Sequence, residues 1–179
     1  MNQDNKKFIV LVDDNPVTLQ SGMNVLSGNY RVATAPSAIK LFELLEANQP
    51  DIIILDVDIP EVNGYQIIQV LKFRADTKDI PVIFLTGKTN SEDEVMGLSL
   101  GAIDYITKPF QPSLLLKRVE MHLLIEEQNK KIKNIVGLHD TLIKTMMELA
   151  VCQEKISEGS INEVQQQIRV LLDQIKINN

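Results

Sequence analysis

Three carboxylates, a hydroxyl and an ammonium group stand at the C-terminal ends of four short apolar runs. The carboxylates belong to Asp13, Asp14 and Asp56, the hydroxyl to Thr86 and the ammonium to Lys108. If the runs are parallel strands, their C-terminal ends line one edge of a sheet, where α/β folds bind their ligands. The five side chains together predict a site for a divalent cation and a phosphoryl group.

These groups are complementary in charge. The adjacent acids repel each other and Asp56, so ionising all three without a cation is costly. Oxygen ligands with few charges favour Mg²⁺, which keeps several waters. A carboxylate here can also attack a phosphoryl group and form an aspartyl phosphate. Lys108 can neutralise one phosphoryl oxygen, Thr86 can donate a hydrogen bond to another, and Gly87 lets the backbone approach closely.

Each residue alone has a simpler explanation. Asp14 suits a turn or a helix cap, Thr86 suits a strand end, and Lys108 suits a solvated surface position. The coincidence of complementary groups at four strand ends is what favours a functional site.

The elements that must position these groups alternate along the first part of the chain. Short strands rich in Ile and Val are expected at 8–12, 30–35, 51–56, 81–86 and 104–107. Helical patterns lie at 16–27, 37–48, 64–75 and 91–100. Pro16 suits a first helical turn, and Ser37 suits an N-cap. This alternation predicts an α/β fold with a doubly wound, five-stranded parallel sheet.

The pattern changes after Pro112, where strands disappear and apolar residues follow heptad spacing. The seam, with Ile125 one repeat upstream, consists of Ile132, Ile135, His139, Leu142, Met146, Leu149, Gln153 and Ile156. Residues 157–159 interrupt it, and Ser160 with Glu163 forms a capping box for a second helix. We expect domains at 1–125 and 126–179. The second is a helical hairpin that pairs two chains as a coiled coil or a four-helix bundle, or else folds back on its own domain.

Composition and charge disfavour several classes of protein. The 179 residues carry a net charge of −6, and no stretch is basic enough for a nucleic-acid face. No apolar stretch reaches the roughly 20 residues of a membrane span, and the polar N-terminus does not resemble a signal peptide. The single cysteine, Cys152, fits a reducing compartment and an apolar position in a helix. We expect a cytoplasmic protein without nucleic-acid or membrane partners.

The strand-end residues resemble the motifs of one known family, the receiver domains of two-component response regulators. The resemblance covers roughly residues 6–125. Its motifs are V-D-D-N at 12–15, L-D-x-x-x-P at 55–60 with Gly64 after it, L-T-G at 85–87 and Y-I-T-K-P-F at 105–110. By this resemblance Asp56 is the phosphoacceptor, and Thr86 and Lys108 contact the phosphoryl group. The implied Mg²⁺ ligands are Asp13, Asp14, Asp56 and the backbone carbonyl of Asp58.

The resemblance also implies a switch and a partner. Tyr105 matches an aromatic residue that turns inward when Thr86 moves toward the phosphate. The Lys108–Pro109 peptide bond would be cis. A histidine kinase or a phosphotransfer protein would supply the phosphoryl group. The side chain of Asp58 is unusual for its position, and it could attract metal or alter the attack of water on the phosphoaspartate.

The histidines raise a separate question. The stretch G-L-H-D-T-L around His139 resembles the phosphoacceptor box of one class of histidine-kinase dimerisation helices, with Asp140 as the orienting acid. Gly137 and Lys144 depart from that pattern, and the heptad places His139 on the seam. A structural histidine is therefore the favoured interpretation, with phosphotransfer as the alternative. His122 is interpreted as structural.

We therefore predict a response regulator that accepts a phosphoryl group on Asp56 and signals through a dimeric helical hairpin. Its enzymatic chemistry would be limited to its own phosphorylation and dephosphorylation. One alternative is a phosphorelay fragment with transfer between Asp56 and His139, and another is an adaptor that uses the receiver only for protein contacts. A Mg²⁺-dependent phosphohydrolase is disfavoured because its nucleophile would end the first strand. The chain ends directly after the expected hairpin, which is compatible with a longer protein.

Overall fold

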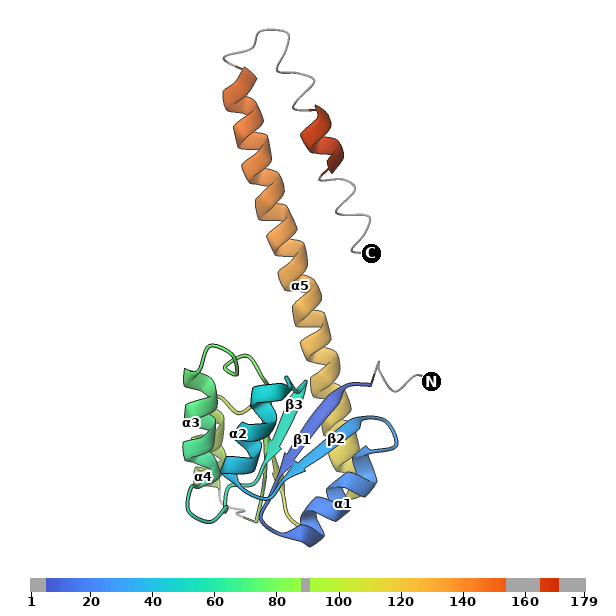
Figure 1. Cartoon of the computed structure of the whole chain (residues 1–179), viewed down its shortest axis with the longest axis vertical. Coiled ribbons are helices and arrows are strands. Elements are labelled where there is room, and N and C mark those ends of the chain that lie inside the picture. The colour runs from blue at the N-terminus through green and yellow to red at the C-terminus, as the bar shows by residue number, and fades with distance from the viewer. Residues whose placement is uncertain (1–5, 88–90, 154–164, 171–179) are drawn as a thin grey trace. The chain divides into compact units, whose positions relative to one another are not determined.

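The computed structural model describes residues 6–87, 91–153 and 165–170 (Figure 1). The chain divides into two compact units, Met1–Glu126 and Glu127–Asn179. No helix in the described ranges is both long enough and apolar enough to cross a bilayer.

The first unit is built on a five-stranded, fully parallel sheet in the order β2-β1-β3-β4-β5. The strands are β1 (Phe8–Val12), β2 (Arg31–Ala35), β3 (Ile52–Leu55), β4 (Val82–Thr86) and β5 (Asp104–Thr107). From β1 the chain moves outward to β2 and then returns to the other side of β1 for β3. This reversal is the switch point at which doubly wound sheets open a crevice beyond the strand ends. The predicted fold class is confirmed.

The helices α1 (Pro16–Leu26), α2 (Ala38–Ala47), α3 (Gly64–Phe73), α4 (Ser91–Ser99) and α5 (Pro112–Gln153) follow the strands in turn. Pro16 begins α1, and the Ser37 hydroxyl accepts from the amide of Lys40, which confirms its predicted role as an N-cap. The predicted helix ends lie one or two residues too far. Asn48 and Arg74 are C-cap residues with extended backbones whose amides still bond into the last turn. The predicted helices therefore include residues that lie beyond the helical backbone.

Two apolar layers enclose the sheet because alternate strand residues point to opposite faces. One layer contains Val10, Val12, Ile53, Leu55, Val82 and Phe84, packed with Leu41 of α2 and Ile67, Ile68 and Leu71 of α3. The other contains Ile9, Leu11, Ile52, Ile54, Ile83 and Leu85, packed with Leu26 of α1 and Leu115, Val119 and Leu123 of α5. The strands are thus covered on both faces, and their ends are held rigidly.

In the second unit the described residues are helical. Every side chain from Glu127 to Lys144 is exposed. The exposed large apolar side chains among the described residues of this unit are Ile132, Ile135, Val136, Leu138, Leu142, Ile143, Met146, Met147, Ile168 and Val170. Residues 165–170 are helical within the predicted second helix. The predicted break at 157–159 and the capping box of Ser160 and Glu163 lie outside the described residues, as do Ile156 and the side chain of Cys152.

Candidate functional site

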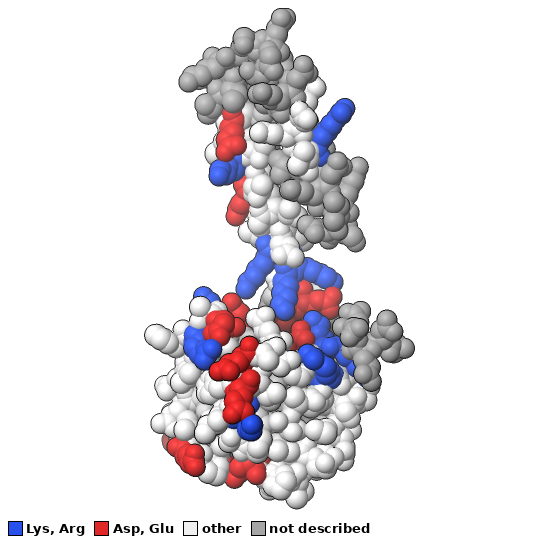
Figure 2. All heavy atoms as spheres, in the orientation of Figure 1, with Lys and Arg blue, Asp and Glu red and all other residues white. Residues whose placement is uncertain are grey.

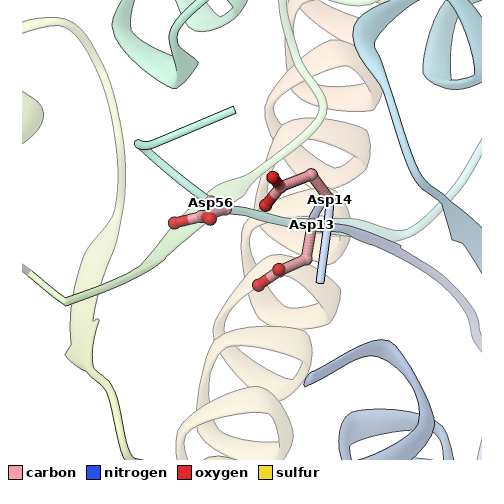
Figure 3. A group of neighbouring side chains, drawn as sticks. All are labelled: Asp13, Asp14 and Asp56. Atoms are coloured by element: carbon pink, nitrogen blue, oxygen red, sulfur yellow. The ribbon is translucent and has the colours of Figure 1, made fainter. Parts of the chain in front are cut away.

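The predicted acidic residues meet at the C-terminal edge of the sheet (Figure 3). Carboxylate oxygens of Asp13, Asp14 and Asp56 all lie within 4.8 Å of one another. The pairing of β1 with β3 positions Asp13 beside Asp56, because the Asp56 amide donates to the carbonyl of Val12, the residue before Asp13, at 2.8 Å. Asp13 and Asp56 are buried, whereas Asp14 is exposed at the rim. The site is therefore shielded from solvent at Asp13 and Asp56 and open to solvent at Asp14.

Lys108 supplies the positive charge of this site. Its Nζ lies 2.5 Å from Asp13 Oδ2 and 2.8 Å from Asp56 Oδ2. The Lys108 amide donates to the Thr86 carbonyl at 2.7 Å, and the Lys108–Pro109 bond is cis, as predicted. Burial alone would lower the pKa of Lys108, but its contacts with the two carboxylates outweigh burial and raise that pKa. Lys108 therefore stays charged.

The carboxylates nevertheless outnumber the cation. Burial raises the pKa of Asp13, and the contact with Lys108 does not offset this. Within the described part of the chain, the buried Asp56 Oδ1 accepts no hydrogen bond. A buried carboxylate oxygen without a partner beside two further carboxylates is an unfavourable arrangement for the protein alone. It is the donor set that a hard divalent cation prefers, so the residues fit Mg²⁺.

Thr86 completes the edge at the end of β4, the neighbour of β3 in the sheet, and is fully buried. Gly87 follows it and is exposed, and a Cβ atom there would meet no other atom within 4 Å. The space beside Gly87 is therefore open. One edge of the sheet therefore carries three carboxylates, one of which has an unbonded oxygen, together with an ammonium and a hydroxyl. Such a combination of groups suits the acceptance of a phosphoryl group.

Comparisons with known proteins show the family of this chain. The family model described as response regulator receiver domain matches residues 9–120. The chain belongs to this family. Among the solved structures similar to it is the chemotaxis response regulator CheY4 of Vibrio cholerae, with a TM-score of 0.62 and 27% identity, covering 65% of this chain and 98% of that one. A CheY-like receiver domain protein from Methanospirillum hungatei JF-1 has a TM-score of 0.64 and 28% identity, covering 70% and 99%.

Curated relatives of this receiver protein are longer than the chain. It is 42% identical over 137 residues to a probable cyclic di-GMP phosphodiesterase of Vibrio cholerae, which is 76% of this chain but 30% of that protein. It is 44% identical over 90 residues to the response regulator SaeR of Staphylococcus aureus, which is 50% of this chain and 38% of that protein. The family match already includes the first residues of α5, which begins at Pro112. A match of 137 residues must continue past residue 120, so the similarity to the Vibrio protein extends further along α5 than the family match does.

The receiver contains a glycine whose contact the sequence motif alone did not reveal. Gly64 begins α3, and a Cβ atom there would lie 2.2 Å from the backbone carbonyl oxygen of Asp56. Its amide donates to the Val57 carbonyl at 2.8 Å. The start of α3 therefore rests on the backbone of the predicted phosphoacceptor. A glycine at a helix start, where better helix formers are available, was the signal for such a close approach.

The remaining residues singled out in the receiver's sequence fall in three places. Tyr105, the predicted switch, is 9% exposed and its ring lies inward against Phe84. His122 is 2.8 Å from Asp104, in agreement with its structural interpretation. His139 and Asp140 are exposed on α5, in the second unit.

Proposed function

We propose that Asp56 accepts a phosphoryl group and that the chain is a phosphorylation-controlled switch. Receiver domains act with histidine kinases or phosphotransfer proteins, and we infer such a donor here. The observation that carries the proposal is the state of the Asp56 carboxylate. One oxygen is held by Lys108, while the buried Oδ1 accepts no hydrogen bond in the described part of the chain. A carboxylate held on one side and unbonded on the other is oriented for attack.

The transfer follows from these contacts. Asp56 Oδ1 forms the new bond to phosphorus, while the bond from phosphorus to the donor's imidazole nitrogen breaks and that nitrogen keeps the electron pair. Lys108 exchanges a carboxylate oxygen for a phosphoryl oxygen, because the phosphoryl group brings more negative charge than Asp56 loses. The Thr86 hydroxyl donates a hydrogen bond to another phosphoryl oxygen. Each step uses a group already present at the edge.

Mg²⁺ fits the same edge. We propose that Asp13, Asp14 and Asp56 hold it together with the backbone carbonyl of Asp58, and that it neutralises negative charge during the transfer. Burial raises the pKa of Asp13, and the neighbouring charge of Asp56 adds to that effect, so a cation at this edge would favour the ionised carboxylate. The side chain of Asp58 is exposed and adds a further negative charge beside the site.

We further propose that residues 126–179 signal as a homodimer. The exposed apolar residues extend beyond the seam to Val136, Leu138 and Ile143, so the stripe is wider than two helices need and suits a four-helix bundle. Uncharged surface occupies much of the visible face of this helix in Figure 2. An exposed stripe of this size on a single chain requires a partner, and a second copy supplies a stripe of the same shape.

Labelling with acetyl phosphate tests the acceptor. We expect Mg²⁺-dependent phosphorylation of the wild-type chain, loss of it in Asp56→Asn, and no change in Asp51→Asn, which alters the acid at the other end of the same strand. Unchanged labelling of Asp56→Asn would contradict the proposal. The mass in solution, measured with and without beryllofluoride, tests the dimer separately, and a monomer under both conditions would exclude it.

A relay to His139 is a second candidate, which the exposure of both His139 and Asp140 supports. Phosphohistidine is labile to acid and stable to base, whereas phosphoaspartate has the opposite behaviour in base. Base-stable label that disappears in His139→Gln would support the relay. Label that is entirely base-labile would exclude it.

A further inference from the structure

Tyr65 lies between the predicted acceptor and the predicted switch. It is the second residue of α3, directly after Gly64, whose backbone rests on the carbonyl of Asp56. Its side chain is 6% exposed. Tyr65 is therefore separated from the Asp56 backbone by a single closely packed residue.

The hydroxyl of Tyr65 connects two further elements. It donates to the carbonyl of Asp93, in the first turn of α4, at 3.2 Å. It is also hydrogen-bonded to the side chain of Tyr105. A phenol has a single proton, so the Tyr65 hydroxyl donates to only one of these two partners at a time. Burial raises the pKa of Tyr65 far above its ordinary value, so the hydroxyl keeps its proton at neutral pH.

The rings of these residues form one packed group. The Tyr65 and Phe84 ring centroids are 5.3 Å apart at 74°, and those of Phe84 and Tyr105 are 6.4 Å apart at 66°. Gly97 of α4 closes the group, because a Cβ atom there would lie 3.0 Å from Phe84 and 3.6 Å from Tyr105. Edge-to-face rings of this kind contribute beyond the area they bury. In its inward position the Tyr105 ring is therefore packed against Phe84 and Gly97, and its side chain interacts with the Tyr65 hydroxyl.

We propose that Tyr65 is a positioning residue that holds Tyr105 in its inward conformation and ties it to α4. The inference rests on the proposed function in that Tyr105 is taken as the switch. It adds a second connection from the acceptor to the switch, along Asp56, Gly64 and Tyr65. Figure 1 shows α3 and α4 on the same side of the sheet, where a hydroxyl from one helix can bind the other.

The chain's three tyrosines and absence of tryptophan permit a direct test. Full-length protein with ¹³C-labelled tyrosine rings gives tyrosine signals that the variants Tyr30→Phe, Tyr65→Phe and Tyr105→Phe assign. A soluble paramagnetic probe then reports the exposure of the Tyr105 ring. Tyr65→Phe keeps the ring and removes only the hydroxyl, and Tyr30→Phe is the matched control because Tyr30 packs against the other face of the sheet. Binding of beryllofluoride with Mg²⁺ is measured on the same samples.

We expect Tyr65→Phe to increase the paramagnetic relaxation of the Tyr105 ring several-fold, with beryllofluoride affinity within about twofold of wild type, while Tyr30→Phe changes neither. Equal protection of Tyr105 in Tyr65→Phe and wild type would overturn the inference. Failure of the wild type to bind beryllofluoride would instead remove the proposed function, and the protection measured without ligand would still decide the role of Tyr65. If Tyr65→Phe does not fold, Tyr105→Phe replaces it: faster hydrogen exchange at the start of α4 supports the inference, and unchanged exchange contradicts it.

Discussion

In two clusters of the receiver, aspartate carboxylates at least partly shielded from solvent contact a cation, and the clusters differ in the balance of donors and acceptors. At the C-terminal edge, three carboxylates lie close together, and two of them, those of Asp13 and Asp56, share the ammonium of Lys108. At the start of β5, the single carboxylate of Asp104 accepts hydrogen bonds from Arg118 Nη1 at 2.9 Å and the Tyr105 amide at 2.8 Å. It also lies 2.8 Å from His122 Nε2. The first cluster has more acceptors than donors, whereas in the second the donors satisfy the acceptor.

The pKa values follow this balance. Burial raises the pKa of Asp13 despite Lys108. Burial would also raise the pKa of Asp104, but its hydrogen bonds from His122, the Tyr105 amide and Arg118 outweigh burial and lower that pKa. A carboxylate that the protein itself satisfies serves the fold. One that the protein leaves partly unsatisfied is ready for a ligand.

The largest difference between the clusters should appear when each loses its main cation. In EDTA we expect Lys108→Met to lower the free energy of unfolding by about 3 kcal/mol, because buried carboxylates lose their counter-ion. Arg118→Met should cost about 1 kcal/mol, because His122 and a backbone amide still hold Asp104 and the arginine is partly solvated. Urea unfolding measures both. Equal losses would show that the two clusters are equally satisfied.

Removing the carboxylate itself should have opposite signs in the two clusters. Asp104→Asn should destabilise the protein by about 2 kcal/mol, because the partly buried hydrogen bonds from Arg118, His122 and the Tyr105 amide lose their charged acceptor. Asp13→Asn should stabilise the metal-free protein by about 1 kcal/mol, since it relieves repulsion, and should abolish stabilisation by Mg²⁺. Asp76→Asn is the control, because Asp76 forms an exposed pair with Arg74. A loss of stability in Asp13→Asn without metal would contradict the imbalance.

The smallest effect is the pH dependence of the satisfied cluster. The pKa of Asp104 in the folded state lies below the ordinary value of 3.8. Its ionised form therefore stabilises the fold at pH values above 3.8, and this contribution disappears as the pH falls through the lowered folded pKa. The stability difference between wild type and Asp104→Asn should be constant near neutral pH and shrink below 3.8. A difference that begins to shrink well above that value would mean that Asp104 is not preferentially ionised in the fold.

The sequence could place the acidic edge because each residue follows a strand whose apolar pattern is local. Once β1, β3 and β4 are parallel neighbours, Asp13, Asp56 and Thr86 must lie along one edge. The chemistry expected there did not depend on any long-range detail. Helix ends were predicted less well, because the amides of the C-cap residues Asn48 and Arg74 still bond into the last turn after the backbone has left the helical conformation.

The satisfied cluster and the aromatic group could not be predicted in the same way. Asp104 meets Arg118 and His122 only because α5 returns along the sheet beside β5, and nothing in their spacing marks them as partners. Tyr65 and Tyr105 lie 40 residues apart and belong to different elements. Contacts that depend on how helices pack, rather than on where strands end, leave little signal in one sequence.

Locating the acyl phosphate within the chain tests most directly whether Asp56 is the phosphoacceptor. After incubation with acetyl phosphate and Mg²⁺, borohydride reduces an aspartyl phosphate to homoserine, which peptide sequencing by mass spectrometry locates. We expect homoserine at position 56, and at no other aspartate of the acidic edge. Homoserine at another aspartate, or phosphorylation that leaves no reducible acyl phosphate, would contradict it.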